Sequence, residues 1–102
     1  MRTYVYLVHI HLVPNPHGDR LPGRTRAAIT AAAAGIADVV HVALHSGARP
    51  GPVIGVYLAI ASLREAEAAA LDIWNAACAS HAWLRDWELV QAEVPIMPGY
   101  DW

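Results

Sequence analysis

The chain has 102 residues, of which 56% are hydrophobic and 16% are charged, with a formal net charge of −2. This length predicts one domain over residues 1–102 and is too short for two separate cores. Lysine is absent and the arginines are scattered rather than gathered into a basic patch, so nucleic acid is not expected as a partner. So short and apolar a chain is expected to hide part of its surface against another molecule.

The cysteine content and the apolar segments favour the cytoplasm. A single cysteine, Cys78, excludes an internal disulfide and suits a reducing compartment. It lies among alanines and is expected to be a small buried apolar residue rather than a reactive thiol. The apolar N-terminal segment is broken by two histidines and ends at Pro14 without a cleavage site of small residues. No stretch approaches the roughly 20 apolar residues of a membrane span, so we expect a cytoplasmic protein without a membrane partner.

The first half of the chain predicts a strand, a long loop, a helix and a second strand. Residues 3–13 are rich in β-branched and aromatic side chains, which are typical of strands. The prolines and glycines of residues 14–23 exclude regular structure. Strong helix formers fill residues 24–34, and Gly35 follows where a helix commonly ends. Residues 37–45 again indicate a strand.

The second half predicts a strand, a helix and a final strand. Residues 53–61 form the third strand after a wide turn. Ser62 and Glu65 fit a capping box at the start of a helix that extends to His81. The buried stripe of this helix is expected to contain Leu63, Ala66, Ala70, Ile73 and Ala77, with Trp74 beside it. Residues 86–96 predict the fourth strand, and a short tail follows.

The order β-α-β-β-α-β predicts a ferredoxin-like α+β domain. Its four-stranded antiparallel sheet has the spatial order 4-1-3-2, with both helices on one face. This pattern, the chain length and the aromatic tail resemble the dimeric α/β-barrel superfamily, which includes small antibiotic-biosynthesis monooxygenases, polyketide cyclases and muconolactone isomerase. The resemblance covers nearly the whole chain and implies a homodimer. It carries no catalytic motif, so no site residue is transferred from the family.

Side chains alternate between the two faces of a strand, which sorts each predicted strand into two rows. The bulky aliphatic rows are expected to face the helices: Tyr4, Tyr6, Val8, Ile10 and Leu12; Val40, Val42 and Leu44; Ile54, Val56, Leu58 and Ile60; Val90, Ala92 and Val94. The opposite face, which we call the open face, is then expected to collect His9, His11, His41, His45, Tyr57, Trp87, Gln91 and Glu93, with the apolar Val5, Leu7, Val13, Val39, Ala43, Val53, Gly55, Ala59, Ala61 and Leu89. A face this apolar and this rich in titratable groups indicates a ligand site or an interface. Two copies packed with these faces together would enclose it.

The open face favours acid–base chemistry on a small hydrophobic molecule. His9 or His11 would remove or relay a proton, Glu93 would orient that imidazole, and Tyr57 would stabilise a developing enolate or phenolate. The remaining side chains would hold the substrate: His41, His45, Trp87, Gln91, Leu7 and Leu89. We therefore expect a cofactor-independent enzyme that cyclises, isomerises or oxygenates an aromatic or polyketide-like metabolite. The loop of residues 14–23 is a candidate lid.

Two alternatives remain open. His9 and His11 could bind a metal ion with Glu93 as a third ligand, although H-x-H alone is a weak motif. His41 and His45 could not share that ion, because four strand residues span roughly 13 Å. The protein could instead be a non-catalytic ligand carrier or an accessory subunit. Its tail would then anchor a partner through the aromatic residue types favoured at interfaces, Tyr100 and Trp102.

Overall fold

The computed structural model describes residues 2–95 and confirms the predicted order of elements. A short 3₁₀ helix, η1, precedes the last strand and was not predicted. The elements are β1 Tyr4–Leu12, α1 Thr25–Ala32, β2 Asp38–His45, β3 Val53–Ile60, α2 Leu63–Ser80, η1 Ala82–Asp86 and β4 Leu89–Glu93.

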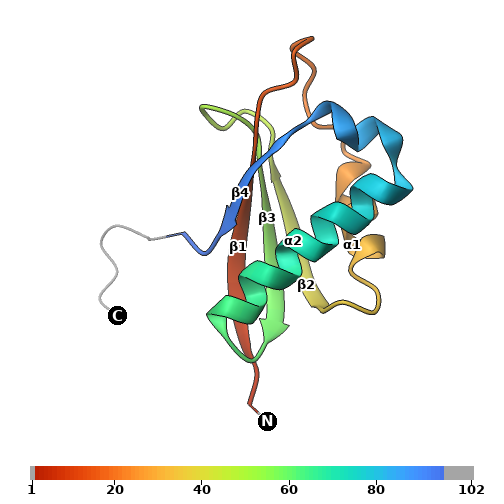
Figure 1. Cartoon of the computed structure of the whole chain (residues 1–102). Coiled ribbons are helices and arrows are strands. Elements are labelled where there is room, and N and C mark those ends of the chain that lie inside the picture. The colour runs from red at the N-terminus through yellow and green to blue at the C-terminus, as the bar shows by residue number, and fades with distance from the viewer. Residues whose placement is uncertain (1, 96–102) are drawn as a thin grey trace.

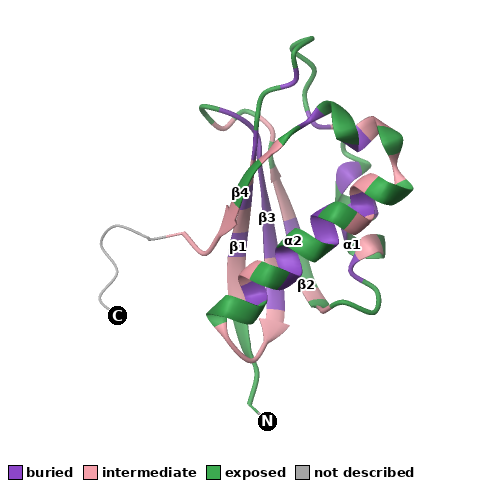
Figure 2. Cartoon of the chain, viewed as in Figure 1, coloured by how far each residue is buried: buried purple, intermediate pink, exposed green. Residues whose placement is uncertain are grey.

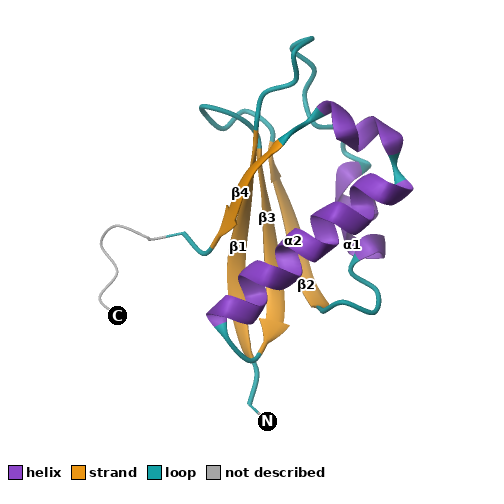
Figure 3. Ribbon diagram, viewed as in Figure 1, coloured by secondary structure: helices purple, strands orange, loops and turns teal. Residues whose placement is uncertain are grey.

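The four strands form one antiparallel sheet in the order β2-β3-β1-β4, which is the predicted ferredoxin-like arrangement (Figure 1). Helices α1 and α2 lie side by side on one face of this sheet (Figure 3). Among the described residues, no helix covers the other face. None of the helices described in residues 2–95 combines the length and apolar character that a membrane crossing requires.

The core lies between the two central strands and the helices, and here the predicted rows are correct. Buried residues occur along both central strands and along α2 (Figure 2). They pack in a single cluster that includes Val8, Ile10 and Leu12 of β1, Ile54, Val56 and Leu58 of β3, Ile29 of α1 and Ile73 of α2. Burial of such side chains away from water is the main source of stability in a domain of this kind.

Helix α2 begins at the predicted capping box. The backbone N–H of Glu65 donates to the hydroxyl oxygen of Ser62 at 3.2 Å, which satisfies one of the free donors in the first turn. Of the predicted stripe, Ala66, Ala70, Ile73 and Ala77 are buried, and Trp74 is buried beside them. The prediction for Leu63 is wrong. It is 45% exposed, because this first turn lies at the end of the sheet (Figure 1).

In the edge strand β2 the predicted alternation fails at a bulge. Val39 pairs with Leu58 and His41 pairs with Tyr57, so Val40 is an extra residue without a partner in β3. A bulge of this kind reverses the alternation on one side of it. Val39 therefore packs against the core and Val40 is 60% exposed, whereas the sequence predicted the opposite for both.

The other edge strand, β4, contains a similar irregularity. His11 pairs with Gln91, but Leu12 pairs with Leu89, so Val90 is the extra residue. Leu89 packs against the core and Val90 is 60% exposed. The predictions that Leu89 faces the open side and Val90 the helices are therefore wrong.

Trp87 is also misplaced by the sequence prediction. Residue 86 ends η1, and β4 begins only at Leu89, so the alternation of a strand does not apply to Trp87. Its side chain is 5% exposed and belongs to the core cluster. The fourth strand is thus shorter than predicted, and the aromatic ring that was expected over the open face instead stabilises the core.

The turn between β2 and β3 packs closely against the end of β1. The backbone N–H of Leu12 donates to the carbonyl oxygen of Pro52 at 3.0 Å. Gly51 is buried, and a Cβ atom there would overlap the carbonyl oxygen of Leu12 and lie 3.1 Å from Cδ of Pro14. Glycine is therefore the residue that allows the two backbones to approach this closely.

Candidate functional site

The two histidines of β1 lie on the open face, as predicted. Their neighbours Val8 and Ile10 are fully buried on the helix face, so the alternation of the strand fixes His9 and His11 on the opposite side. Both imidazoles are half-buried, and their ring centroids are 5.9 Å apart. A central strand thus presents two adjacent titratable groups in a setting that limits their access to water.

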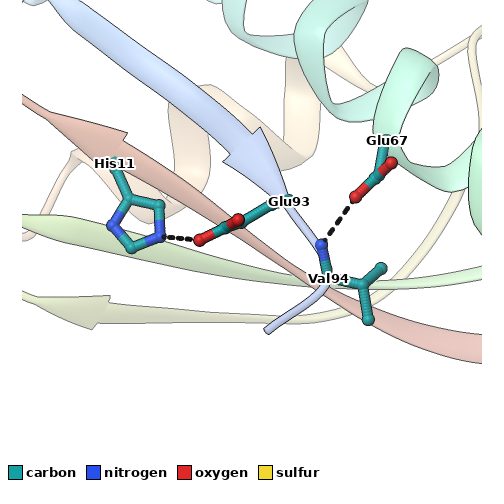
Figure 4. A network of polar contacts seen from close by, with 4 residues as sticks. All are labelled: His11, Glu67, Glu93 and Val94. Carbon is teal, nitrogen blue, oxygen red and sulfur yellow. Dashed lines mark hydrogen bonds and ion pairs between the residues drawn. The ribbon is translucent and has the colours of Figure 1, made fainter. Parts of the chain in front are cut away.

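Strand β4 supplies the predicted polar partners on one side of this pair. Glu93 pairs with His9 and Gln91 pairs with His11 in the antiparallel register. The carboxylate of Glu93 points toward His11, with Oε1 3.2 Å from Nε2 (Figure 4). This contact has the distance of an ion pair but not the alignment of a hydrogen bond, and no other described group bonds to Nε2 of His11. The Glu93 carboxylate therefore faces the Nε2 side of the His11 ring.

Next to the contact between Glu93 and His11, a hydrogen bond connects the end of β4 to helix α2. The backbone N–H of Val94 donates to Oε2 of Glu67 at 2.9 Å (Figure 4). Because Glu93 immediately precedes Val94, this bond fixes the backbone from which the Glu93 carboxylate extends. The position of Glu93 opposite the histidines is thus supported from the helix layer.

On the other side of the pair, the register does not place Tyr57 directly opposite either histidine, although the sequence predicted that Tyr57 would stabilise an enolate or phenolate formed there. Gly55 is opposite His9, and Tyr57 is opposite Leu7. The ring of Tyr57 instead packs against that of His41, at a centroid distance of 5.6 Å. Tyr57 and His41 therefore form a separate polar pair further along the open face.

His45 of β2 approaches His9 of β1 over Gly55, the residue of β3 that lies between them. Its ring centroid is 6.1 Å from that of His9. A Cβ atom on Gly55 would lie 3.7 Å from Nε2 of His45 and 3.3 Å from Cδ1 of Leu7. The absence of a side chain at Gly55 thus lets Leu7 and His45 pack closely over the centre of the sheet. We call His9, His11, His45 and Glu93 the histidine cluster.

The electrostatics of the cluster favour a neutral His9. Burial lowers the pKa of His9 below its usual value of 6.5, and the neighbouring His11 and His45 lower it further, while Glu93 partly opposes them. At neutral pH the imidazole of His9 is therefore unprotonated. A neutral imidazole in a half-buried position can accept a proton from a bound molecule.

The predicted substrate-binding residues divide into two groups. Leu7, His41, His45 and Gln91 lie on the open face, where a ligand could contact them. Trp87 and Leu89 contribute to the core on the other side of the sheet, so neither is part of this site.

One residue of the site was not predicted from the sequence. Arg20, from the loop of residues 14–23, lines an open depression of about 580 Å³ together with His9, His45 and Val53. A single arginine in a loop of prolines and glycines carries no signal that could have identified it. The loop itself is anchored by the buried Leu21 and by a turn in which the N–H of His17 donates to Oδ1 of Asn15 at 2.7 Å. Its role as a lid stays a prediction.

The remaining sequence predictions concern groups outside the histidine cluster. Within residues 2–95, no three His, Cys, Asp or Glu side chains are placed to ligate one ion, so the geometry gives no support to a metal site on His9, His11 and Glu93. Cys78 is half-buried beside the core, and burial raises the pKa of its thiol. The aromatic tail, with Tyr100 and Trp102, lies outside the described residues.

Comparisons with models of known families, with curated proteins and with solved structures gave no match for this chain. The ferredoxin-like topology is thus established by the arrangement of the elements alone. Functional assignment depends on the chemistry of the open face.

Proposed function

We propose that this protein is a small cofactor-independent enzyme of the dimeric α/β-barrel type. It would bind a hydrophobic, aromatic or polyketide-like molecule over the open face and move a proton on it. The observation that carries this proposal is the half-buried His9, whose lowered pKa keeps it neutral, beside a second imidazole that contacts Glu93 at 3.2 Å. In this proposal His9 accepts a proton, and His11 is oriented by the carboxylate of Glu93.

The proposed reaction begins when His9 removes a proton from a carbon next to a carbonyl group of the substrate. The electron pair of the broken C–H bond forms an enolate, and His9 becomes an imidazolium. His11, oriented by Glu93, donates a hydrogen bond to the enolate oxygen and so lowers the energy of this intermediate. The same enolate leads to cyclisation or isomerisation and, with dioxygen as the co-substrate, to oxygenation.

The other polar pair of the open face, His41 and Tyr57, would contact the far end of the substrate. This pair lies further along the sheet than His9, because Tyr57 is opposite Leu7 and not opposite His9. Tyr57 is therefore proposed to hold the substrate and not to stabilise the enolate formed at His9. A phenol and an imidazole provide hydrogen bonds to an oxygen-rich aromatic molecule.

Dimerisation would enclose the site. The open face exposes apolar side chains, including Val5 at 59%, which is unfavourable in a lone protomer. A twofold dimer that packs the two open faces together would cover these side chains and exclude water from the histidine cluster. Native mass spectrometry of the untagged protein is expected to show a dimer. A monomer at micromolar concentration would contradict the enclosed site.

Exchange of carbon-bound hydrogen tests the catalytic proposal directly. We expect the protein to accelerate deuterium incorporation from D₂O into 2-tetralone, an aromatic ketone with acidic α-protons, as followed by NMR. His9→Ala and His11→Ala should each lower this rate by about 100-fold or more, the range typical of a lost general base or acid. His81→Ala, which lies at the end of α2 and outside the open face, is the matched control.

The outcomes of this assay separate an enzyme from a carrier. Circular dichroism would first establish that each variant is folded. Unchanged exchange in both folded variants would remove the catalytic role of the histidines. Tight binding of 2-tetralone by the wild-type protein without any exchange would instead favour a non-catalytic ligand carrier.

A further inference from the structure

A permanently charged group borders the histidine cluster at one end of the open face. The loop of residues 14–23 and the turn between β2 and β3 lie at the same end of the sheet (Figure 1). Arg20 of this loop lines a depression together with Ser46 and Gly47 of the turn. Its Nη2 atom lies 3.5 Å from the position that a Cβ of Gly47 would occupy. Together with His9 and His45 it lines the depression of about 580 Å³. One guanidinium and two imidazoles thus face the same space.

No carboxylate balances the charge of Arg20 in the part of the chain that the structure describes. Three other arginines have partners there: Arg24 lies over the Trp83 ring, and Arg26 and Arg85 donate to backbone carbonyl oxygens. Arg20 forms no ion pair or side-chain hydrogen bond with residues 2–95, and no acidic residue lines the depression. Asp19 and Arg49 line the adjoining hollow together with Arg20, and Glu93 contacts His11.

A second donor without a partner lies beside Arg20. Asn15 is 5% exposed, and its Oδ1 accepts the N–H of His17, which fixes the orientation of the carboxamide. Its Nδ2 atom is buried and has no acceptor among the described residues. Asn15 lines the adjoining hollow, which shares Arg20, Ser46 and Gly47 with the first depression. A buried N–H donor without an acceptor is costly, and a bound anion would remove that cost.

We propose that this end of the open face binds the carboxylate of a hydrophobic carboxylic acid, with Arg20 as its main partner. A guanidinium presents two parallel N–H groups that match the two oxygens of a carboxylate. The apolar body of the acid would lie over Val53, which lines the same depression as His9. That the acid is a substrate rests on the proposed function. Binding of its carboxylate at Arg20 does not require that the protein be an enzyme.

The lining favours a carboxylate over a phosphate group. Among residues 2–95, Arg20 is the only permanently charged cation that lines this depression, and Leu44, Ala48 and Val53 line it as apolar residues. A phosphate with two negative charges would be poorly neutralised there, because the lowered pKa of His9 keeps that imidazole neutral at pH 7. A bound anion should in turn raise the pKa of His9, since the favourable charge stabilises the imidazolium.

Binding of 2-naphthoate, compared with the neutral 2-naphthamide of the same shape, tests the proposal. Backbone and histidine NMR signals would be followed at pH 7 in the wild-type protein, in Arg20→Gln and in Arg64→Gln, which removes an exposed arginine of α2 as the matched control. We expect 2-naphthoate to shift the signals of His9, His45 and Gly47 and to raise the pKa of His9. Arg20→Gln should weaken this binding by about tenfold or more, as loss of a charge-assisted hydrogen bond does. Arg64→Gln should not change it.

Equal affinity of wild-type and folded Arg20→Gln protein for 2-naphthoate would overturn the proposal. So would equal binding of naphthoate and naphthamide, or tighter binding of inorganic phosphate than of naphthoate. The exchange assay separates this result from the proposed function. Arg20-dependent binding of naphthoate without exchange of 2-tetralone would keep the anion site and reject the enzyme, and the reverse result would reject only the anion site.

Discussion

Replacement of Gly51 by alanine would measure how strongly the fold depends on the close approach of the β2–β3 turn to β1. The added methyl group would overlap the carbonyl oxygen of Leu12, and backbone atoms cannot rotate away as a side chain can. The two segments would have to separate, which weakens the 3.0 Å bond from the N–H of Leu12 to Pro52. Overpacking costs about 1–3 kcal/mol, and loss of an internal hydrogen bond costs about 0.5–1.5 kcal/mol. We therefore expect the free energy of unfolding to fall by about 2–4 kcal/mol.

Gly55→Ala is the matched control for this experiment. Its methyl group would meet only side-chain atoms, with Cδ1 of Leu7 nearest at 3.3 Å, so a small rotation relieves the contact. We expect its free energy of unfolding to stay within about 1 kcal/mol of the wild-type value. Because the methyl group would displace Leu7 and crowd His45, which lines the depression, the same variant should bind 2-naphthoate more weakly.

Urea titration and thermal melting, both followed by circular dichroism, would give the two free energies. For a domain of this size, the loss expected in Gly51→Ala corresponds to a fall in Tm of about 10–25 °C. Equal losses in the two variants would refute the reasoning, because the contact at Gly51 would then have no special weight. A loss below about 0.5 kcal/mol in Gly51→Ala would refute it as well.

Two further predictions concern pH and the bulge in β2. Because the pKa of His9 is lower in the folded protein than its usual 6.5, the unfolded chain binds the proton more readily, and stability should fall as the pH drops from about 6.5 through the lowered pKa. His9→Ala should reduce this fall in urea titrations between about pH 7.5 and 5, and an unchanged pH dependence would contradict the assigned shift. Deletion of Val40, the extra residue of the bulge, should leave the pairs of β2 with β3 intact and lower the free energy of unfolding by less than about 1 kcal/mol. Deletion of the buried Val42 should instead reverse the alternation and unfold the strand; similar effects of the two deletions would show that Val40 is not the inserted residue.

The fold could be predicted from the sequence because its central strands and helices follow simple patterns. In β1 and β3 the larger aliphatic residues occupy every second position, and each of these strands has a partner on both sides that holds it in register. The capping box at Ser62 marks the start of α2 by a hydrogen bond that the sequence specifies locally. Such signals depend on neighbouring residues alone and need no knowledge of the tertiary structure.

The site could be predicted only in part. His9 and His11 were placed correctly because they lie on a central strand, and Glu93 and Gln91 because the register across β1 continues as expected. The approach of His45 to His9 depends on the glycine between them, and that of Arg20 on the course of a loop. Neither follows from a strand pattern, since each depends on how separate segments meet in three dimensions.

The two bulges explain how the sheet keeps its faces distinct. In β2 the segment Val39–His41 needs an apolar residue on the helix face and a histidine on the open face, but these lie two positions apart and would share a face in a regular strand. The same conflict separates Leu89 from Gln91 in β4. One inserted residue in each edge strand resolves it, and the inserted side chain is a valine that is 60% exposed in both cases, Val40 and Val90. Exposure of one valine in each edge strand is thus the energetic cost of directing the polar side chains of the open face away from the core. An edge strand can accommodate this because only one of its sides must match a hydrogen-bonded neighbour.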